Sequence, residues 1–141
     1  MIIVPLNIFH YPYSTPLLSN LTTSGQLTYK DYLEILNKIN KNENHYVFVC
    51  EINDIPAGMI TLIIEQKLIH SGKCVGHIED LVVGPEFLRK GVAKTLIDQC
   101  VNLCKENNCY KVILDCKKEL IPFYNKSNFE EQGVCMRRSL D

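Results

Sequence analysis

Apolar and polar residues follow two different periods along the chain, and each period predicts one type of element. Apolar side chains recur at helical spacing behind Thr28, which can cap a helix, and again between Ala93 and Cys104. β-Branched and aromatic runs predict strands instead. The expected strands are 46–52, 57–64, 73–83, 111–115 and, near the end, 134–138.

Turn signals separate these segments. Asn53-Asp54 predicts a hairpin turn, and Gly84-Pro85 ends the third expected strand. Residues 11–26 are turn-rich and are interpreted as loop and short helix, and 66–72 as a loop. A short helix is expected over 119–126, with Pro122 in its first turn. The resulting order of helix, three strands, helix, strand, helix and strand predicts a mixed α/β domain.

Composition narrows the class of protein. The chain has 141 residues, 46% of them apolar, which suits a single domain over 1–141 with a real core. A net charge of -1 argues against a nucleic-acid binder. No apolar run is long enough to span a membrane, and no signal-peptide pattern opens the chain. The seven cysteines lie mostly in apolar segments, so we expect buried, reduced thiols and a cytoplasmic protein.

The stretch from Glu79 to Thr95 carries the main chemical signal. An expected strand runs into a basic loop with Gly91, and this loop opens a long amphipathic helix. Amides at the start of a helix are unpaired, so those of 89–93 are able to hold phosphates. The alternative is an ordinary helix start with solvated basic side chains. Neither a Walker A loop nor a GxGxxG fingerprint is present.

This loop resembles the acyl-CoA pyrophosphate loop of the GCN5-related N-acetyltransferases (GNAT), whose pattern is Gln/Arg-x-x-Gly-x-Gly/Ala. The chain has Leu88-Arg-Lys-Gly91-Val-Ala93, so Leu88 departs from the pattern. Five further segments resemble the glucosamine-6-phosphate N-acetyltransferases of that superfamily, in order and spacing, and the resemblance extends from about 17 to 138. These segments are Leu21–Gly25, Glu65–His70, Gly76–Asp80, Cys109–Cys116 and Phe123–Lys126.

The resemblance implies a GNAT fold, with a central mixed sheet flanked by helices, in which the strand before the loop splays from its neighbour. It also implies transfer of acetyl from acetyl-CoA to the amine of D-glucosamine 6-phosphate, on the way to UDP-N-acetylglucosamine, by direct attack in a ternary complex. The implied catalytic residues are Glu79, Asp80, Asp115 and Tyr124. Glu79 and Asp80 are adjacent, so on a regular strand their side chains face opposite ways. Asp115 ends a strand expected to be buried, and the Tyr124 phenol is able to protonate a departing thiolate.

The resemblance also implies two sets of binding residues. The acetyl-CoA set is Leu81, Val82, Val83, Leu88, Arg89, Lys90, Gly91, Val92, Ala93, Lys94 and Tyr124. Of these, 81–83 are expected to act through their main chain. The sugar-phosphate set is Thr22, Lys67, Leu68, Ile69, His70, Glu79, Asp80, Tyr110, Lys111, Asp115, Arg137 and Arg138. The choice between the two arginines is open, and Leu120 stands where relatives often have an asparagine.

Other readings stay open at this point. An acetyltransferase for protein amines or polyamines fits the loop, and so does a non-catalytic acyl-CoA-binding module. His70 and His77 lack the spacing of a metal site, and Cys100 with Cys104 is typical of helix packing, so no metal is expected. The resemblance implies a homodimer whose C-terminal strands cross, with a sugar site built from both chains.

Overall fold

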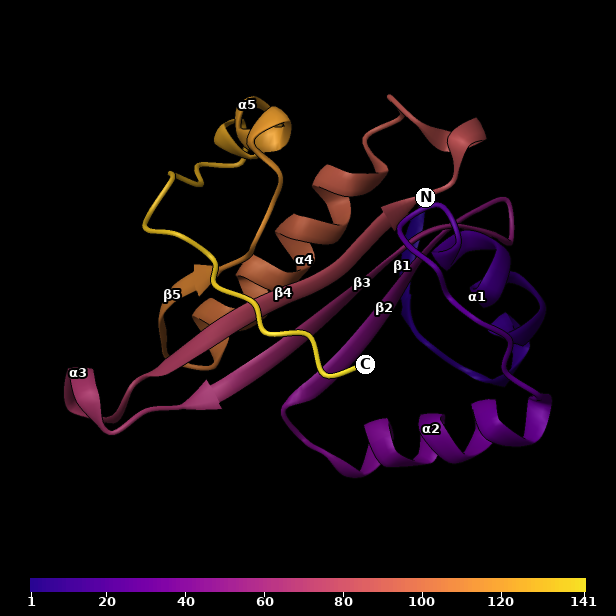
Figure 1. Cartoon of the computed structure of the whole chain (residues 1–141), viewed down its shortest axis with the longest axis horizontal. Coiled ribbons are helices and arrows are strands. Elements are labelled where there is room, and N and C mark those ends of the chain that lie inside the picture. Colours follow the sequence, from indigo (N-terminus) through magenta and orange to yellow (C-terminus); the bar gives the residue numbers. More distant parts are fainter.

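A computed structural model describes all 141 residues and contains one five-stranded sheet with strand order β1-β2-β3-β4-β5 (Figure 1). The neighbouring strands are antiparallel except for β4 and β5, which are parallel. The strands are β1 (Ile2–Pro5), β2 (His45–Ile52), β3 (Ile55–Gln66), β4 (Cys74–Val83) and β5 (Cys109–Ile113). The sheet is therefore mixed, as the family resemblance implies.

Helices lie on both faces of this sheet. They are α1 (Tyr11–Leu18), α2 (Tyr29–Lys41), the four-residue turn α3 (Ile69–Gly72), α4 (Val92–Glu106) and α5 (Ile121–Asn125), with 3₁₀ turns η1 (Ile8–His10), η2 (Pro85–Phe87) and η3 (Lys118–Leu120). Thr28 caps α2 as predicted, because its hydroxyl accepts the Asp31 N–H at 3.1 Å. Pro122 lies in the first turn of α5, also as predicted. None of these helices has the length and apolarity needed to cross a membrane.

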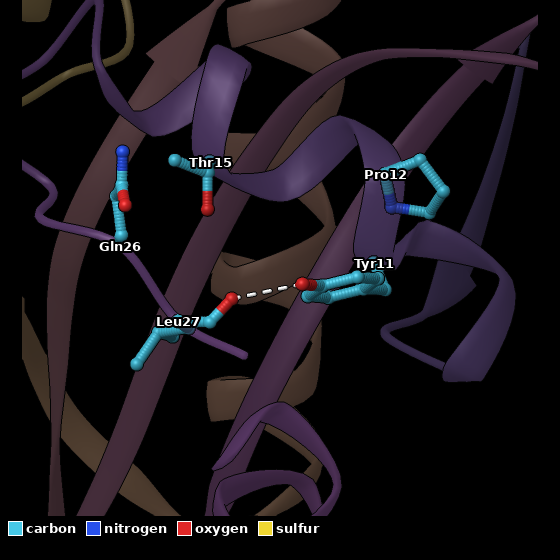
Figure 2. A pocket seen from close by; sticks show the side chains of 5 residues that line it. All are labelled: Tyr11, Pro12, Thr15, Gln26 and Leu27. Atoms are coloured by element: carbon cyan, nitrogen blue, oxygen red, sulfur yellow. Dashed lines mark hydrogen bonds between the residues drawn. The ribbon is translucent and has the colours of Figure 1, made fainter. Parts of the chain in front are cut away.

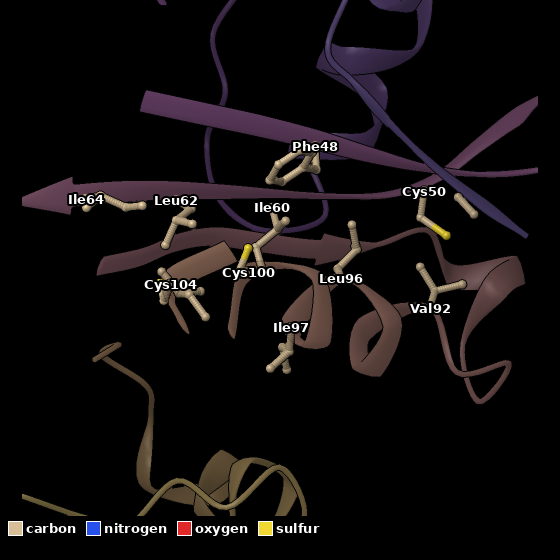
Figure 3. Packing of buried hydrophobic residues seen from close by; sticks show 12 residues of the cluster. Phe48, Cys50, Ile60, Leu62, Ile64, Val92, Leu96, Ile97, Cys100 and Cys104 are labelled. Carbon is tan, nitrogen blue, oxygen red and sulfur yellow. The ribbon is translucent and has the colours of Figure 1, made fainter. Parts of the chain in front are cut away.

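The larger hydrophobic cluster lies between α4 and one face of the sheet (Figure 3). The apolar stripe of α4 contributes Val92, Leu96, Ile97, Cys100 and Cys104, all at most 1% exposed. They pack on strand residues that alternate along β2, β3 and β4, among them Phe48, Ile60 and Ile78. A smaller cluster on the other face joins Leu17 of α1 to Val49, Met59 and Val82. The two periods of the sequence thus meet in the core.

Two glycines allow α4 to approach the sheet closely. A Cβ on Gly58 of β3 would lie 2.7 Å from Val92 Cγ1 and 2.9 Å from the Val82 carbonyl oxygen. A Cβ on Gly76 of β4 would overlap the Cys104 sulfur. Any larger residue at either position would push α4 away from the strands. These glycines therefore fix the distance between α4 and the strands β3 and β4.

Several expectations about local structure are wrong. Residues 134–138 form no strand and are exposed, and β1 and η1 were not expected. A strand needs a partner, and the tail 134–138 pairs with none within this chain, whereas β1 gains one in β2. β5 ends at Ile113 and is half-buried, so Asp115 follows the strand and is exposed rather than ending a buried strand. The 66–72 loop contains the α3 turn, in which His70 and Ser71 have left-handed φ of 52° and 58°.

Candidate functional site

The two parallel strands separate halfway along β4. Their last paired residues are His77 and Ile113, whereas β4 remains paired with β3 as far as Val83 and Gly58. The edge of β4 from 78 to 83 that faces away from β3 therefore has no strand beside it. Its main-chain N–H and C=O groups are free to bind an extended ligand there. This is the splay that the family resemblance implies.

A β-bulge at Asp80 changes how the acidic pair is presented. Thr61 pairs with Glu79 and Met59 pairs with Val82, so two β4 residues lie opposite Ile60 alone. Asp80 adopts a left-handed φ of 51° at this point. The strict alternation that we expected for Glu79 and Asp80 is therefore broken, and both residues are exposed. The bulge also turns Val82 toward Leu17, on the face opposite α4.

A third carboxylate lies in the same neighbourhood. Partial burial, together with the negative charges of Asp80 and Asp115, raises the pKa of Glu79, while His77 opposes this shift. Asp115 reaches this region from the segment after β5, where its Oδ2 accepts the Cys135 thiol at 3.4 Å. We call Glu79, Asp80 and Asp115 the carboxylate cluster. Three acidic groups beside an open strand edge favour a cationic or amine-bearing ligand.

The loop between β4 and α4 has the backbone of an anion site. Gly91 precedes α4 with a left-handed φ of 81°, no side chain caps the helix, and a Cβ on Gly91 would meet nothing within 4 Å. The first amide bonded to the Gly91 carbonyl is that of Thr95, at 3.0 Å. The amides of 92–94 thus lack carbonyl partners within the helix, and the positive end of the helix dipole lies there. Arg89 is also left-handed, at 63°.

Two side chains of this loop and helix start already have partners within the chain. Val92 is 1% exposed and packs in the core, so only its main chain is available to a ligand. Lys94 forms an ion pair with Asp98 one turn along the helix. Lys90 Nζ lies 5.6 Å from the centroid of the Phe87 ring. The Leu88 side chain is 58% exposed. Leu88, Arg89, Lys90 and Ala93 belong to the loop and helix start that contain the unpaired amides of 92–94.

Tyr124 is half-buried on α5, against the cluster that also contacts Leu81 and Val83 of the free strand edge. Its ring is edge-on to Phe123 at 5.0 Å and to Phe129 at 6.1 Å. Burial, with a smaller contribution from Cys116, raises the pKa of the Tyr124 phenol. The phenol therefore stays protonated at neutral pH and can act as a proton donor. α5 and the start of α4 lie in the same, upper part of Figure 1.

The predicted sugar-binding residues fall into separate groups. At the tip of the β3–β4 hairpin, the His70 ring stacks on Tyr110 at 3.8 Å, and Lys111 Nζ lies 5.5 Å from the Tyr110 centroid. Lys67 pairs with Glu65 at 3.0 Å, and Glu65 also binds His77 at 2.9 Å. Leu68 and Ile69 are exposed there. This tip lies about 16 Å along β4 from Glu79, at roughly 3.3 Å per residue.

Thr22 belongs to neither the hairpin tip nor the carboxylate cluster. It is exposed in the segment between α1 and α2, and its N–H donates to the Leu18 carbonyl at 3.2 Å. An open groove of about 320 Å³ lies beside this segment, lined by Tyr11, Pro12, Thr15, Gln26 and Leu27 (Figure 2). The Tyr11 hydroxyl donates to the Leu27 carbonyl at 2.9 Å across it.

The two C-terminal arginines and most of the cysteines lie outside the core. Arg137 and Arg138 are exposed on the tail, and Arg137 is close enough to Cys135 to lower the pKa of its thiol, against the stronger raising effect of Asp115. All seven cysteines are free, but only Cys50, Cys100 and Cys104 are buried, whereas Cys74 and Cys109 are half-buried and Cys116 and Cys135 are exposed. No group of three or more His, Cys, Asp or Glu side chains is placed to hold a metal. Nothing in the sequence singled out Cys135, because only the folded chain brings its thiol to Asp115.

A family model, a related sequence and a solved structure all match this chain to acetyltransferases. The model of the acetyltransferase (GNAT) family matches residues 14–129. The glucosamine 6-phosphate N-acetyltransferase of Candida albicans is 35% identical over 121 residues, which cover 84% of this chain and 81% of that protein. The crystal structure of the enzyme of that name from Arabidopsis thaliana superposes with a TM-score of 0.93 at 30% identity, over 99% of this chain and 98% of that one.

The sheet with its separated strands and the uncapped, glycine-containing loop before α4 agree with these matches. The chain belongs to the acetyltransferase (GNAT) family and, within it, to the glucosamine 6-phosphate N-acetyltransferases.

Proposed function

We propose that the chain transfers acetyl from acetyl-CoA to the amine of D-glucosamine 6-phosphate, giving N-acetyl-D-glucosamine 6-phosphate and CoA. The observation that carries this proposal is the free edge of β4, which runs from the carboxylate cluster to the unpaired amides before α4. A diphosphate fits the amides, and an extended thioester arm fits the strand edge. The amine of the acceptor fits the carboxylate cluster. The 81–83 main chain and the loop 88–94 would then hold acetyl-CoA.

The chemistry assigned to the side chains follows from their charges. Glu79, Asp80 and Asp115 attract the aminium form of the acceptor and orient the nitrogen toward the strand edge. The raised pKa of Glu79 makes its carboxylate a better acceptor than an ordinary glutamate for the proton that the amine must lose before attack. As the carbon–nitrogen bond forms and the carbon–sulfur bond breaks, Tyr124 donates a proton to the departing thiolate, and its phenolate takes up the proton that the new amide nitrogen releases. Main-chain N–H groups polarise the carbonyl, so the proposal needs no metal.

The first test is an assay of acceptor-dependent release of CoA thiol. The protein is incubated with acetyl-CoA and, in separate arms, glucosamine 6-phosphate, glucosamine, a lysine peptide or a polyamine. Turnover only with the sugar phosphate supports the proposal. Turnover with the peptide or polyamine indicates another GNAT acceptor, and coenzyme binding without turnover in any arm indicates a binding module. Activity lost after chelation and recovered with zinc or magnesium would contradict the metal-free chemistry.

Tyr124 is tested by Tyr124→Phe. This change removes only the hydroxyl and keeps the ring that packs against Phe123 and Phe129. We expect kcat to fall on the order of 10²-fold, the lower end for general acid catalysis, while KM for acetyl-CoA changes little. Phe123→Tyr on the same helix is the matched control for packing. Undiminished turnover in Tyr124→Phe would remove the phenol from the mechanism.

We also propose that the chain, as one catalytic unit, works in the cytoplasm as a homodimer with shared sugar sites. The tail carries Val134 and Met136, which are 86% and 88% exposed, and it pairs with no strand of its own chain. A second copy would supply that partner. It would also add hairpin-tip residues and a C-terminal arginine from the partner chain to the carboxylate cluster. Sedimentation that finds a fully active monomer at assay concentration would refute the shared site.

The seven free thiols support the cytoplasm, a reducing compartment, as the place where the chain works.

A further inference from the structure

The C-terminal tail contributes one side chain to the carboxylate cluster that no part of the proposed mechanism uses. Cys135 places its sulfur 3.4 Å from Asp115 Oδ2, across 20 residues of sequence. Both side chains are exposed, so neither is held in place by surrounding core. The contact therefore depends on its own polar interaction. It joins two irregular segments, the stretch after β5 and the tail.

Asp115 needs such a partner if its carboxylate is to keep one orientation. It lies beyond the end of β5, where no strand pairing fixes the main chain. Its neighbours Glu79 and Asp80 are also acidic, and like charges drive the carboxylate away from them toward solvent. The Cys135 thiol is the one side-chain hydrogen-bond donor to Asp115 within the chain. Without this hydrogen bond, repulsion from Glu79 and Asp80 favours side-chain conformations of Asp115 that point away from the carboxylate cluster.

We propose that Cys135 is a positioning residue: its S–H donates to Asp115 and holds that carboxylate toward the acceptor amine. This inference rests on the proposed function. The chemistry of the pair is consistent with it, because the hydrogen bond to Asp115 and its charge raise the pKa of the Cys135 thiol. The thiol thus remains an S–H donor at neutral pH and does not become a thiolate that would repel Asp115. Glu79 acts in the same direction and Arg137 in the opposite one.

The kinetic test compares three single variants with the wild type. Cys135→Ala removes the donor, and we expect kcat/KM for glucosamine 6-phosphate to fall about fivefold with KM for acetyl-CoA unchanged, because one hydrogen bond is lost. Cys135→Ser keeps a donor and should recover most of that loss. Leu140→Ala, on a tail residue beyond 134–138 that is 91% exposed, should equal the wild type. Equal kinetics in the wild type and Cys135→Ala would overturn the inference.

A second readout does not depend on turnover. Alkylation of Cys135 by iodoacetamide at pH 8 is followed by peptide mass spectrometry in the wild type and in Asp115→Asn. Removing the charge that stabilises the thiol should increase the alkylation rate of Cys135 severalfold. An unchanged rate overturns the inference, whatever the activity. A wild type that is inactive on glucosamine 6-phosphate would refute the proposed function instead, and the alkylation rate would still decide whether Asp115 holds Cys135.

Discussion

Gly58 offers a direct test of how closely α4 must approach the sheet. In Gly58→Ala, the new methyl carbon would lie 2.7 Å from Val92 Cγ1, 3.2 Å from Leu96 Cδ1 and 2.9 Å from the Val82 carbonyl oxygen. Carbon atoms in contact prefer about 3.5–4.0 Å, so Val92 is roughly 1 Å too close. Val92 is 1% exposed and has no empty space to enter. The start of α4 must therefore move away from β3.

The expected cost is set by this overlap. Overpacking a core costs about 1–3 kcal/mol, and the carbonyl contact places Gly58→Ala toward the upper end because a backbone atom cannot rotate away. For a chain of this size that is roughly 3 °C of Tm for each kcal/mol. Since α4 begins at Val92, next to the Gly91 loop, the same displacement should weaken CoA binding. Urea unfolding measures the first effect and titration calorimetry the second.

A double-mutant cycle separates this cause from a general loss of stability. Val92→Ala alone should cost about 2–3 kcal/mol, for two buried methyl groups and the cavity they leave. In Gly58→Ala/Val92→Ala the new methyl occupies part of that cavity, so the pair should cost at least about 1 kcal/mol less than the sum of the singles. Gly58→Ala/Ile97→Val is the control and should be additive, because Ile97 is not among the atoms nearest to that methyl. Additivity within about 0.5 kcal/mol for the Val92 pair would refute the overlap.

Three further predictions concern the loop, the carboxylate cluster and a helix cap. Gly91→Ala should weaken CoA binding, measured by calorimetry, because φ of 81° strains any residue with a Cβ by about 1 kcal/mol; Gly133→Ala, with a similar φ of 70° on the tail, should not. Glu79→Gln should raise Tm at pH 7–8, because the raised pKa means that ionised Glu79 destabilises the folded chain above that pKa. That gain should shrink as pH falls through the raised pKa and vanish below the ordinary value of 4.5, whereas a gain independent of pH would contradict it. Thr28→Ala should lower the free energy of unfolding by about 1 kcal/mol, and Thr28→Ser by much less, since Ser retains the hydroxyl that accepts the Asp31 N–H.

Local pattern was sufficient for most elements of the fold. The α4 stripe, the Thr28 cap and the Asn53-Asp54 turn depend on neighbours within a few residues, and the structure confirms all three. The Leu88–Ala93 motif likewise predicted a loop with unpaired amides. Such features can be predicted because a periodicity or a turn acts over a single stretch of chain.

Long-range pairing decided the rest. The bulge that presents both Glu79 and Asp80 comes from the register between β3 and β4, and the free edge of β4 comes from where β5 stops pairing. The tail around Cys135 has the residue types of a strand but pairs with no strand of this chain, and Cys135 contacts Asp115 instead. The sequence by itself determined α2, α4, the strands β2 to β4 in outline, and a loop with unpaired amides before α4. Only the tertiary structure decided which acidic groups share one place, because distances between residues far apart in sequence depend on strand register and on the packing of α4.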